Sequence, residues 1–171
     1  MELLNLENMQ EVLQEFAVEV RNHYQDNLIR HDRIASGGLL NSVEAQVETE
    51  DSAYLVQLRL EEYWKYVEND TPPHWPPQSA ILKWIMVKPI LPRRDGRIPT
   101  PQSLAYLIGR AMAGKSPNQL NLKNPHGGTT GTHDLEDAKQ ATLLRFRERI
   151  THALAEDMGQ YIKLVLPRIV G

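Results

Sequence analysis

One eight-residue run in the chain matches the consensus of a phosphate-binding loop. Residues 109–116 read Gly-Arg-Ala-Met-Ala-Gly-Lys-Ser and fit G-x-x-x-x-G-K-[ST], a loop whose backbone N–H groups and lysine hold phosphates. A working loop of this kind follows a buried strand and opens a long helix. Here helical spacing precedes Gly109, and Pro117 comes directly after the matching run. The context therefore opposes nucleotide binding, and a P-loop nucleotide-binding protein is the less favoured alternative.

The other residues with useful chemistry do not form a recognisable catalytic or metal-binding pattern. No H-E-x-x-H or similar compact spacing links the six histidines, which are His23, His31, His74, His126, His133 and His152. A loose metal site at His126 and His133 is the nearest approach, and polar loop residues are the simpler interpretation. The serines lack a G-x-S-x-G elbow, and adjacent Glu61 and Glu62 point to opposite faces of a strand. We therefore expect a protein that is not an enzyme and has no metal or cofactor.

Composition excludes several further classes. The chain has 171 residues, no cysteine and a formal net charge of −3. Without cysteine there is no disulfide scaffold, Cys-ligated zinc, iron–sulfur cluster or cysteine nucleophile. No apolar run approaches the roughly 20 residues of a membrane span, and the first residues lack the basic start of a secretory signal. We therefore expect a product made in a cytoplasm, with no membrane partner.

The small net charge conceals a strong segregation along the chain. Residues 1–20 carry five glutamates and no base, and residues 44–70 carry eight acidic residues against two basic ones. Residues 83–115 carry seven basic residues against one acidic residue. Such a split permits contact between copies, acidic face to basic face. The alternative is that the charged blocks are ordinary solvated surfaces whose uneven charge has no function.

The first half of the chain predicts a long helix followed by a β-hairpin. Apolar residues recur at three- and four-residue steps from about Leu4 to Leu28, which is typical of an amphipathic helix. Ser36-Gly37-Gly38 predicts a turn. Apolar and polar residues then alternate over 43–48 and 54–61, around a turn at 50–52, as in two antiparallel strands with one wet face.

The middle of the chain predicts short helices joined by stiff loops. Residues 63–68 extend the second strand or form a helical turn. Prolines exclude both helix and strand over 71–77. A helix follows at about 78–87 and ends before Pro89, and a basic, proline-rich loop covers 92–99.

The last third predicts two more helices around a long loop. Thr100-Pro101 is a good helix start, with a capping oxygen followed by proline at the first helical position. Residues 114–132 have almost no apolar residue, and a loop of this length is uncommon inside a compact domain. A final long helix begins at Asp134 and ends at Pro167.

Together these elements predict a single α+β domain over residues 1–171. A small antiparallel sheet is flanked by long N- and C-terminal helices, and residues 72–132 form a proline-rich insertion with two short helices and long loops.

Two short motifs lie in this frame. A small-Gly-x-Leu-x-x-Ser pattern leads into the first strand, and a Tyr-x-x-Tyr-x-Glu-x-Gly-Thr pattern follows the hairpin. The matching residues are Gly37, Leu39, Ser42, Tyr63, Tyr66, Glu68 and Thr71, with Asp70 where the pattern has glycine. In these motifs and their order the chain resembles the tail-completion, or head–tail joining (neck), proteins of tailed bacteriophages.

The resemblance implies a structural role in a virion assembled in the host cytoplasm. Members of this family form rings in the neck, so it implies a homo-oligomer whose partners are a portal or adaptor protein and tail proteins. A tail terminator or minor tail protein is the alternative. A ring joins one patch to a different patch, which the split charge would supply.

Several residues are candidates for the interfaces of such a ring, and they are His74, Trp75, Arg93, Arg94, Arg97, Lys115, His126 and His133. Trp75 stands between two proline pairs and is the preferred anchor, whereas local packing explains Trp84 at least as well. The loops 88–99 and 114–132 are expected to reach a neighbouring copy or ring. The alternative for the basic loop is non-specific contact with packaged DNA, through phosphates alone.

Overall fold

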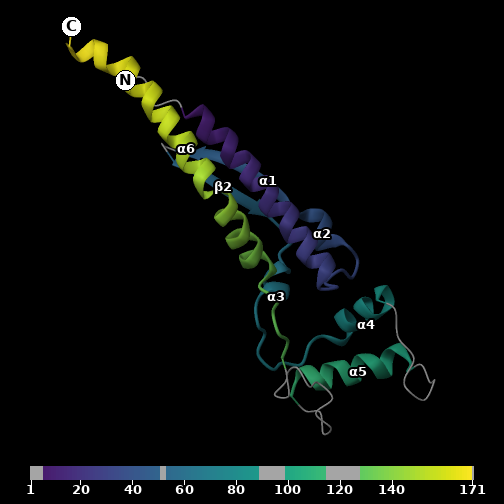
Figure 1. Ribbon diagram of the computed structural model, residues 1–171. Helices are drawn as coiled ribbons and strands as arrows, with labels where there is room; N and C mark the ends of the chain where they lie inside the picture. Colours follow the sequence, from purple (N-terminus) through teal and green to yellow (C-terminus); the bar gives the residue numbers. More distant parts are fainter. Residues whose placement is uncertain (1–5, 51–52, 89–98, 115–127, 171) are drawn as a thin grey trace. The chain divides into compact units, whose positions relative to one another are not determined.

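The structure is a computed structural model that describes residues 6–50, 53–88, 99–114 and 128–170 (Figure 1). The chain divides into two compact units. Unit 1 comprises residues 1–30, 42–60 and 134–171, and unit 2 comprises residues 31–41 and 61–133. The insertion predicted at 72–132 lies wholly within unit 2.

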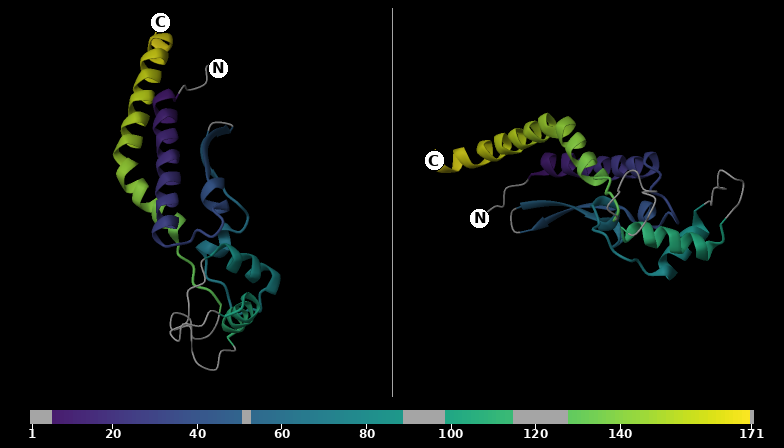
Figure 2. Two further views of the ribbon diagram at one scale, coloured as in Figure 1. Left: turned by 90° about the vertical axis from the view of Figure 1, so that its right-hand side faces the viewer. Right: turned by 90° about the horizontal axis from the view of Figure 1, so that it is seen from below.

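Unit 1 is built on two long helices, α1 (Glu7–Arg30) and α6 (Asp134–Val170), which lie side by side (Figures 1 and 2). The apolar stripe predicted for the first helix packs against α6. The rings of Phe16 and Phe146 meet edge to face there, with ring centroids 5.7 Å apart. Tyr24 and Leu28 are almost completely buried in the same layer. The apolar face of α1 is therefore covered by α6, a helix from the other end of the chain.

The start of α1 is held by a carboxylate from α6. Asp157 is 1% exposed and accepts hydrogen bonds from the backbone N–H groups of Asn8 (3.2 Å) and Met9 (2.9 Å). The Asn8 amide donates a third, at 2.6 Å. Helices normally cap these first N–H groups with a residue just before the helix. Here the cap comes from 149 residues away.

The predicted hairpin is confirmed as β1 (Glu44–Glu50) and β2 (Ala53–Arg59), paired antiparallel with Val47 opposite Val56. Both strands contact α1. The outward-facing residues are mostly polar, and Glu48 accepts hydrogen bonds from Gln57 at 2.8 Å and Arg59 at 3.3 Å. The alternation of the sequence thus separates a face against α1 from a wet face. Two residues of the predicted turn, 51–52, lie outside the described part.

Unit 2 contains short helices: α2 (Gly38–Ser42, whose last residue belongs to unit 1), α3 (Trp64–Glu68), α4 (Gln78–Val87) and α5 (Pro101–Met112). A small core lies between α4 and α5 and consists of Ile81, Ile85 and Ala105, with Leu82, Leu104 and Ile108 packed against it. The predicted bounds of α4 are confirmed. So is the start of α5, where the Thr100 hydroxyl accepts from the Ser103 N–H at 3.2 Å.

The α+β fold class is as predicted, with a two-stranded sheet and long terminal helices. Two local predictions need correction, and the structure decides between two alternatives for a third segment. A short helix, α2, follows the expected turn at Gly37 (φ 81°), and residues 64–68 are helical instead of extending β2. The final helix does not end at Pro167 but continues to Val170. A proline in the last turn removes one N–H donor, and the residues beyond it can keep helical dihedral angles.

Candidate functional site

The two motifs identified in the sequence meet in unit 2. The Tyr63 hydroxyl accepts a hydrogen bond from the Leu39 backbone N–H at 2.6 Å, across 24 residues of sequence. This N–H lies in the first turn of α2, where no donor has a partner inside the helix. Tyr63 therefore caps α2 and ties the glycine-rich segment to the start of α3. Ser42 ends α2, and Tyr66 points outward from α3 with 61% of its surface exposed.

The end of the second motif is paired with the segment that leads into α6. Thr71 exchanges two backbone hydrogen bonds with Thr129, at 2.8 and 3.0 Å. The Glu68 carbonyl accepts from the His133 N–H at 3.2 Å, and the Asp70 carboxylate accepts from the Gly131 N–H at 2.9 Å. Asp70 stands where the second motif has glycine, and this hydrogen bond gives the aspartate a structural role.

Gly128 makes this pairing possible. Its φ of +78° is a conformation that other residues adopt rarely. A Cβ atom at this position would lie 2.1 Å from the Thr71 carbonyl oxygen, which is backbone and cannot move aside cheaply. The close approach of the two segments therefore requires glycine.

Trp75 and His74 lie on a strap that crosses the end of α5. The His74 N–H donates to the Met112 carbonyl at 3.2 Å, and the Trp75 ring packs against Tyr106 with ring centroids 5.8 Å apart. A Cβ atom at Gly109 would contact the same indole at 3.6 Å. Trp75 is nevertheless 44% exposed. It therefore packs within unit 2 and leaves nearly half of its surface exposed.

A pocket of about 580 Å³ lies in unit 2, and we call it the Trp84 pocket. Its lining includes Arg33, Tyr66, Val67, Trp84, Lys88 and Thr129. Lys88 is held by Asp32, with its ammonium group 2.8 Å from the carboxylate and 3.1 Å from the carbonyl oxygen. Arg33 has no ion pair within the described part of the chain. The pocket therefore combines exposed aromatic surface with the guanidinium group of Arg33.

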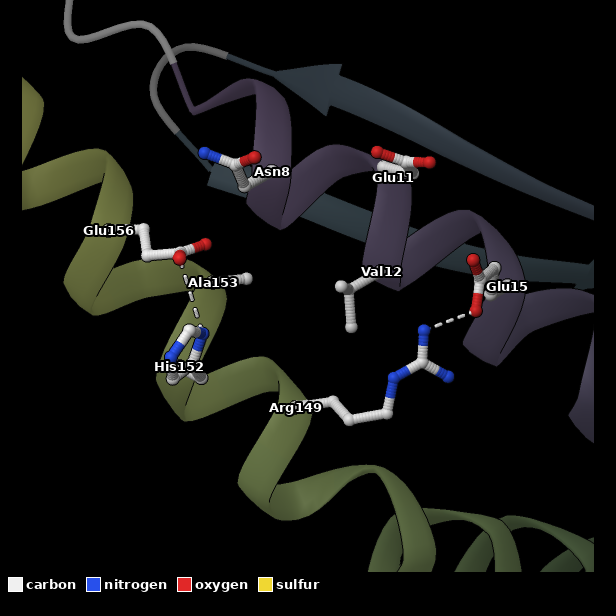
Figure 3. Close-up of a pocket in the computed structure, with 8 residues that line it drawn as sticks. All are labelled: Asn8, Glu11, Val12, Glu15, Arg149, His152, Ala153 and Glu156. Atoms are coloured by element: carbon white, nitrogen blue, oxygen red, sulfur yellow. Dashed lines mark hydrogen bonds and ion pairs between the residues drawn. The ribbon is translucent and has the colours of Figure 1, made fainter.

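A second, smaller hollow of about 320 Å³ lies between α1 and α6 (Figure 3). Figure 3 shows the Arg149 guanidinium turned towards Glu15, with which it forms an ion pair. One turn away, Arg145 pairs with Glu19 at 2.8 Å. Two of the five glutamates in the acidic N-terminal block are thus neutralised within the chain.

At the start of α6 the pKa of Glu136 is lowered, chiefly because Lys139 donates a hydrogen bond to its carboxylate.

The charge segregation follows the two structural units. Unit 1 contains sixteen acidic and nine basic residues, a formal charge of −7. Unit 2 contains six acidic and ten basic residues, a formal charge of +4. The sequence showed the alternating blocks but not which of them share a compact unit.

The structure also bears on the phosphate-loop match. Residues 109–112 are the last turn of α5, so a helix and not a strand leads into the first glycine. Lys115 lies outside the described residues, as do Arg93, Arg94, Arg97 and His126, so the roles predicted for these five stay predictions. His133 is described, with φ 56° just before α6.

Within the described ranges, no three His, Asp or Glu side chains gather in a way that could hold a metal ion. Among the same residues, no helix has the length and apolar character needed to cross a bilayer. No protein-family model matches the chain, and neither a curated protein nor a solved structure does.

Proposed function

We propose that this protein is a structural component of the neck of a tailed-bacteriophage virion, where its copies form a ring between a portal or adaptor and the tail. The observation that carries the proposal is the hydrogen bond between Leu39 and Tyr63. It joins the two motifs on which the family resemblance rests, although 24 residues separate them. Two motifs whose residues contact each other support the family resemblance better than two short matches with no contact between them.

The surface of unit 2 suits a protein that binds other proteins. Tyr66, Trp75 and Trp84 are each 44–61% exposed, and aromatic residues are enriched at protein interfaces. The opposite charges of the two units favour contacts between different patches of identical subunits, which is the geometry that closes a ring. The nucleotide-binding alternative has less support, because α5 occupies the place of the required strand.

The test is the mass of the assembled species. The purified full-length chain is measured by native mass spectrometry and sedimentation over a wide concentration range, alone and with the portal and tail proteins encoded in the same genome. We expect discrete high-order oligomers and binding to the portal or adaptor. Binding to the tail tube alone would favour the tail terminator instead. A strict monomer with no affinity for either partner would overturn the proposal.

A further inference from the structure

We infer that the Trp84 pocket docks the acidic hairpin of a second copy, so that subunits associate head to tail. The inference rests on the proposed ring and names the contact that would build it. The partner is a second copy because the two units of this chain carry formal charges of opposite sign, −7 and +4.

The receiving side is the apolar surface of α4. Ile81 and Ile85 face the small core, yet the other sides of the helix are also largely apolar, with Lys83 as its one charged residue. Met86 is 82% exposed, and Val87 and Trp84 are 50% and 47% exposed. Helices that are apolar all round are usually covered. The Trp84 pocket adjoins this surface, and its volume of about 580 Å³ is within the usual range for binding sites.

The charge at the pocket favours an acidic partner. Lys88 is already occupied by Asp32. Arg33 is exposed and makes no hydrogen bond or ion pair with the described residues, so its guanidinium can donate hydrogen bonds to a carboxylate. Two such pockets facing each other would bring like charges together, which disfavours a symmetric contact.

The outer face of the hairpin has the complementary features. Leu55 is 44% exposed and lies opposite Glu48 in the β1–β2 register, where it offers an apolar anchor. Glu44 is exposed and has no ion pair in the described part of the chain. By contrast, Glu15 and Glu19 of α1 already pair with arginines of α6. Within the described part of unit 1, the hairpin is therefore an acidic surface that combines an unpaired carboxylate with an exposed apolar side chain.

The competing surface is the exposed apolar side of α6, which includes Leu144 (76% exposed), Met158 (40%) and Ile162 (48%). Contact through this side of two copies would be symmetric. It would bring together two units of charge −7 and would close as a dimer instead of a ring. The experiment must distinguish this contact between two α6 helices from the contact between the Trp84 pocket and the hairpin.

The absence of cysteine makes cross-linking a clean test. Single-cysteine variants are made at exposed positions that border the proposed contact: Thr130→Cys at the pocket and Ala53→Cys on the outer face of the hairpin. A third variant, Ala155→Cys, places the thiol on the exposed side of α6. Each is treated with a short bis-maleimide, alone and in pairwise mixtures, after circular dichroism has verified its fold.

We expect a cross-linked dimer in the mixture of Thr130→Cys with Ala53→Cys and none with either variant alone. Self-cross-linking of Ala155→Cys at the level of that mixture would overturn the inference in favour of the α6 contact. Rings in native mass spectra without the expected cross-link would overturn the inference and leave the proposed function standing. A strict monomer would overturn both.

Charge reversal tests the pairing itself. Arg33→Glu should weaken assembly about tenfold, and the double variant Arg33→Glu with Glu44→Arg should recover most of that loss, because the ion pair is rebuilt in the opposite sense. Lys83→Glu, an equal change of charge on an exposed side of α4, is the matched control and should weaken assembly less. A double variant as weak as Arg33→Glu alone would overturn the pairing of these two residues.

Discussion

The two units of this protein bury their apolar residues to very different extents. In unit 1, α1 contacts α6 and the hairpin, and Tyr24, Leu28 and Phe146 are among the buried residues of this unit. In unit 2, α4 and α5 share a cluster centred on Ile81 and Ile85 and leave much of α4 exposed. A region with its own core can fold by itself, whereas a region with a small core gains stability from what covers it. We therefore expect unit 1 to contribute most of the stability, and the proposed function would assign recognition chiefly to unit 2.

The largest expected effect is the loss of a core side chain in unit 1. Leu28→Ala should lower the free energy of unfolding by about 3 kcal/mol, because Leu28 is 1% exposed and the change leaves a cavity. Urea denaturation followed by circular dichroism measures the loss.

In unit 2, Ile85→Ala should increase hydrogen exchange in α4 and α5 and leave α1 and α6 protected. Equal loss of protection in all four helices would show that the two units unfold as one and do not differ in stability.

The next effect is in the backbone pairing of unit 2. Gly128→Ala should destabilise this unit by about 2–3 kcal/mol, since the new Cβ meets the Thr71 carbonyl and φ is positive. Hydrogen exchange at Thr71 and Thr129 reports the loss. The control is Gly159→Ala in α6, where a Cβ has open space and helix propensity predicts a gain of up to about 1 kcal/mol. A neutral Gly128→Ala would contradict the tight approach of the two segments.

The buried cap of α1 gives a smaller effect. Asp157→Ala should cost about 1–2 kcal/mol, because the N–H groups of Asn8 and Met9 lose their acceptor inside unit 1. Thermal unfolding measures it. Glu156→Ala, a change at the exposed neighbouring carboxylate, should shift stability by less than about 0.5 kcal/mol. If the two variants behaved alike, the cap would contribute little to the stability of unit 1.

The contact between the motifs contributes less again. Tyr63→Phe removes the acceptor for the Leu39 N–H and should cost about 1 kcal/mol, confined to unit 2. Tyr66→Phe is the matched control and should be neutral, since Tyr66 is 61% exposed. Faster hydrogen exchange at Leu39 in the first variant only is the expected result. Unchanged exchange in both would remove the support that this contact lends to the proposed function.

The surface ion pairs of unit 1 give the smallest effect. Arg145→Ala should cost less than about 1 kcal/mol at low salt and still less at high salt, because both Arg145 and Glu19 are partly exposed. Unfolding at two ionic strengths measures the difference. A large, salt-independent loss would mean that Arg145 acts through packing and not through its charge.

Local patterns in the sequence predicted most of the elements. The alternation of β1 and β2, the bounds of α4 and the Thr100 cap of α5 all depend on neighbours within a few residues, and all are confirmed. The motif residues Leu39 and Tyr63 were also identified from the sequence, although their contact was not.

Several contacts that the sequence did not predict join residues far apart in the chain. Asp157 caps α1 from 149 residues away, Tyr63 caps α2 across 24 residues, and Thr71 pairs with Thr129. No periodicity encodes such pairs, because they form only where packing brings an orphaned N–H beside an acceptor. The same holds for charge: the sequence determined how many acidic and basic residues there are and in which blocks. The fold decided that the acidic blocks gather mainly in unit 1 and the basic block in unit 2.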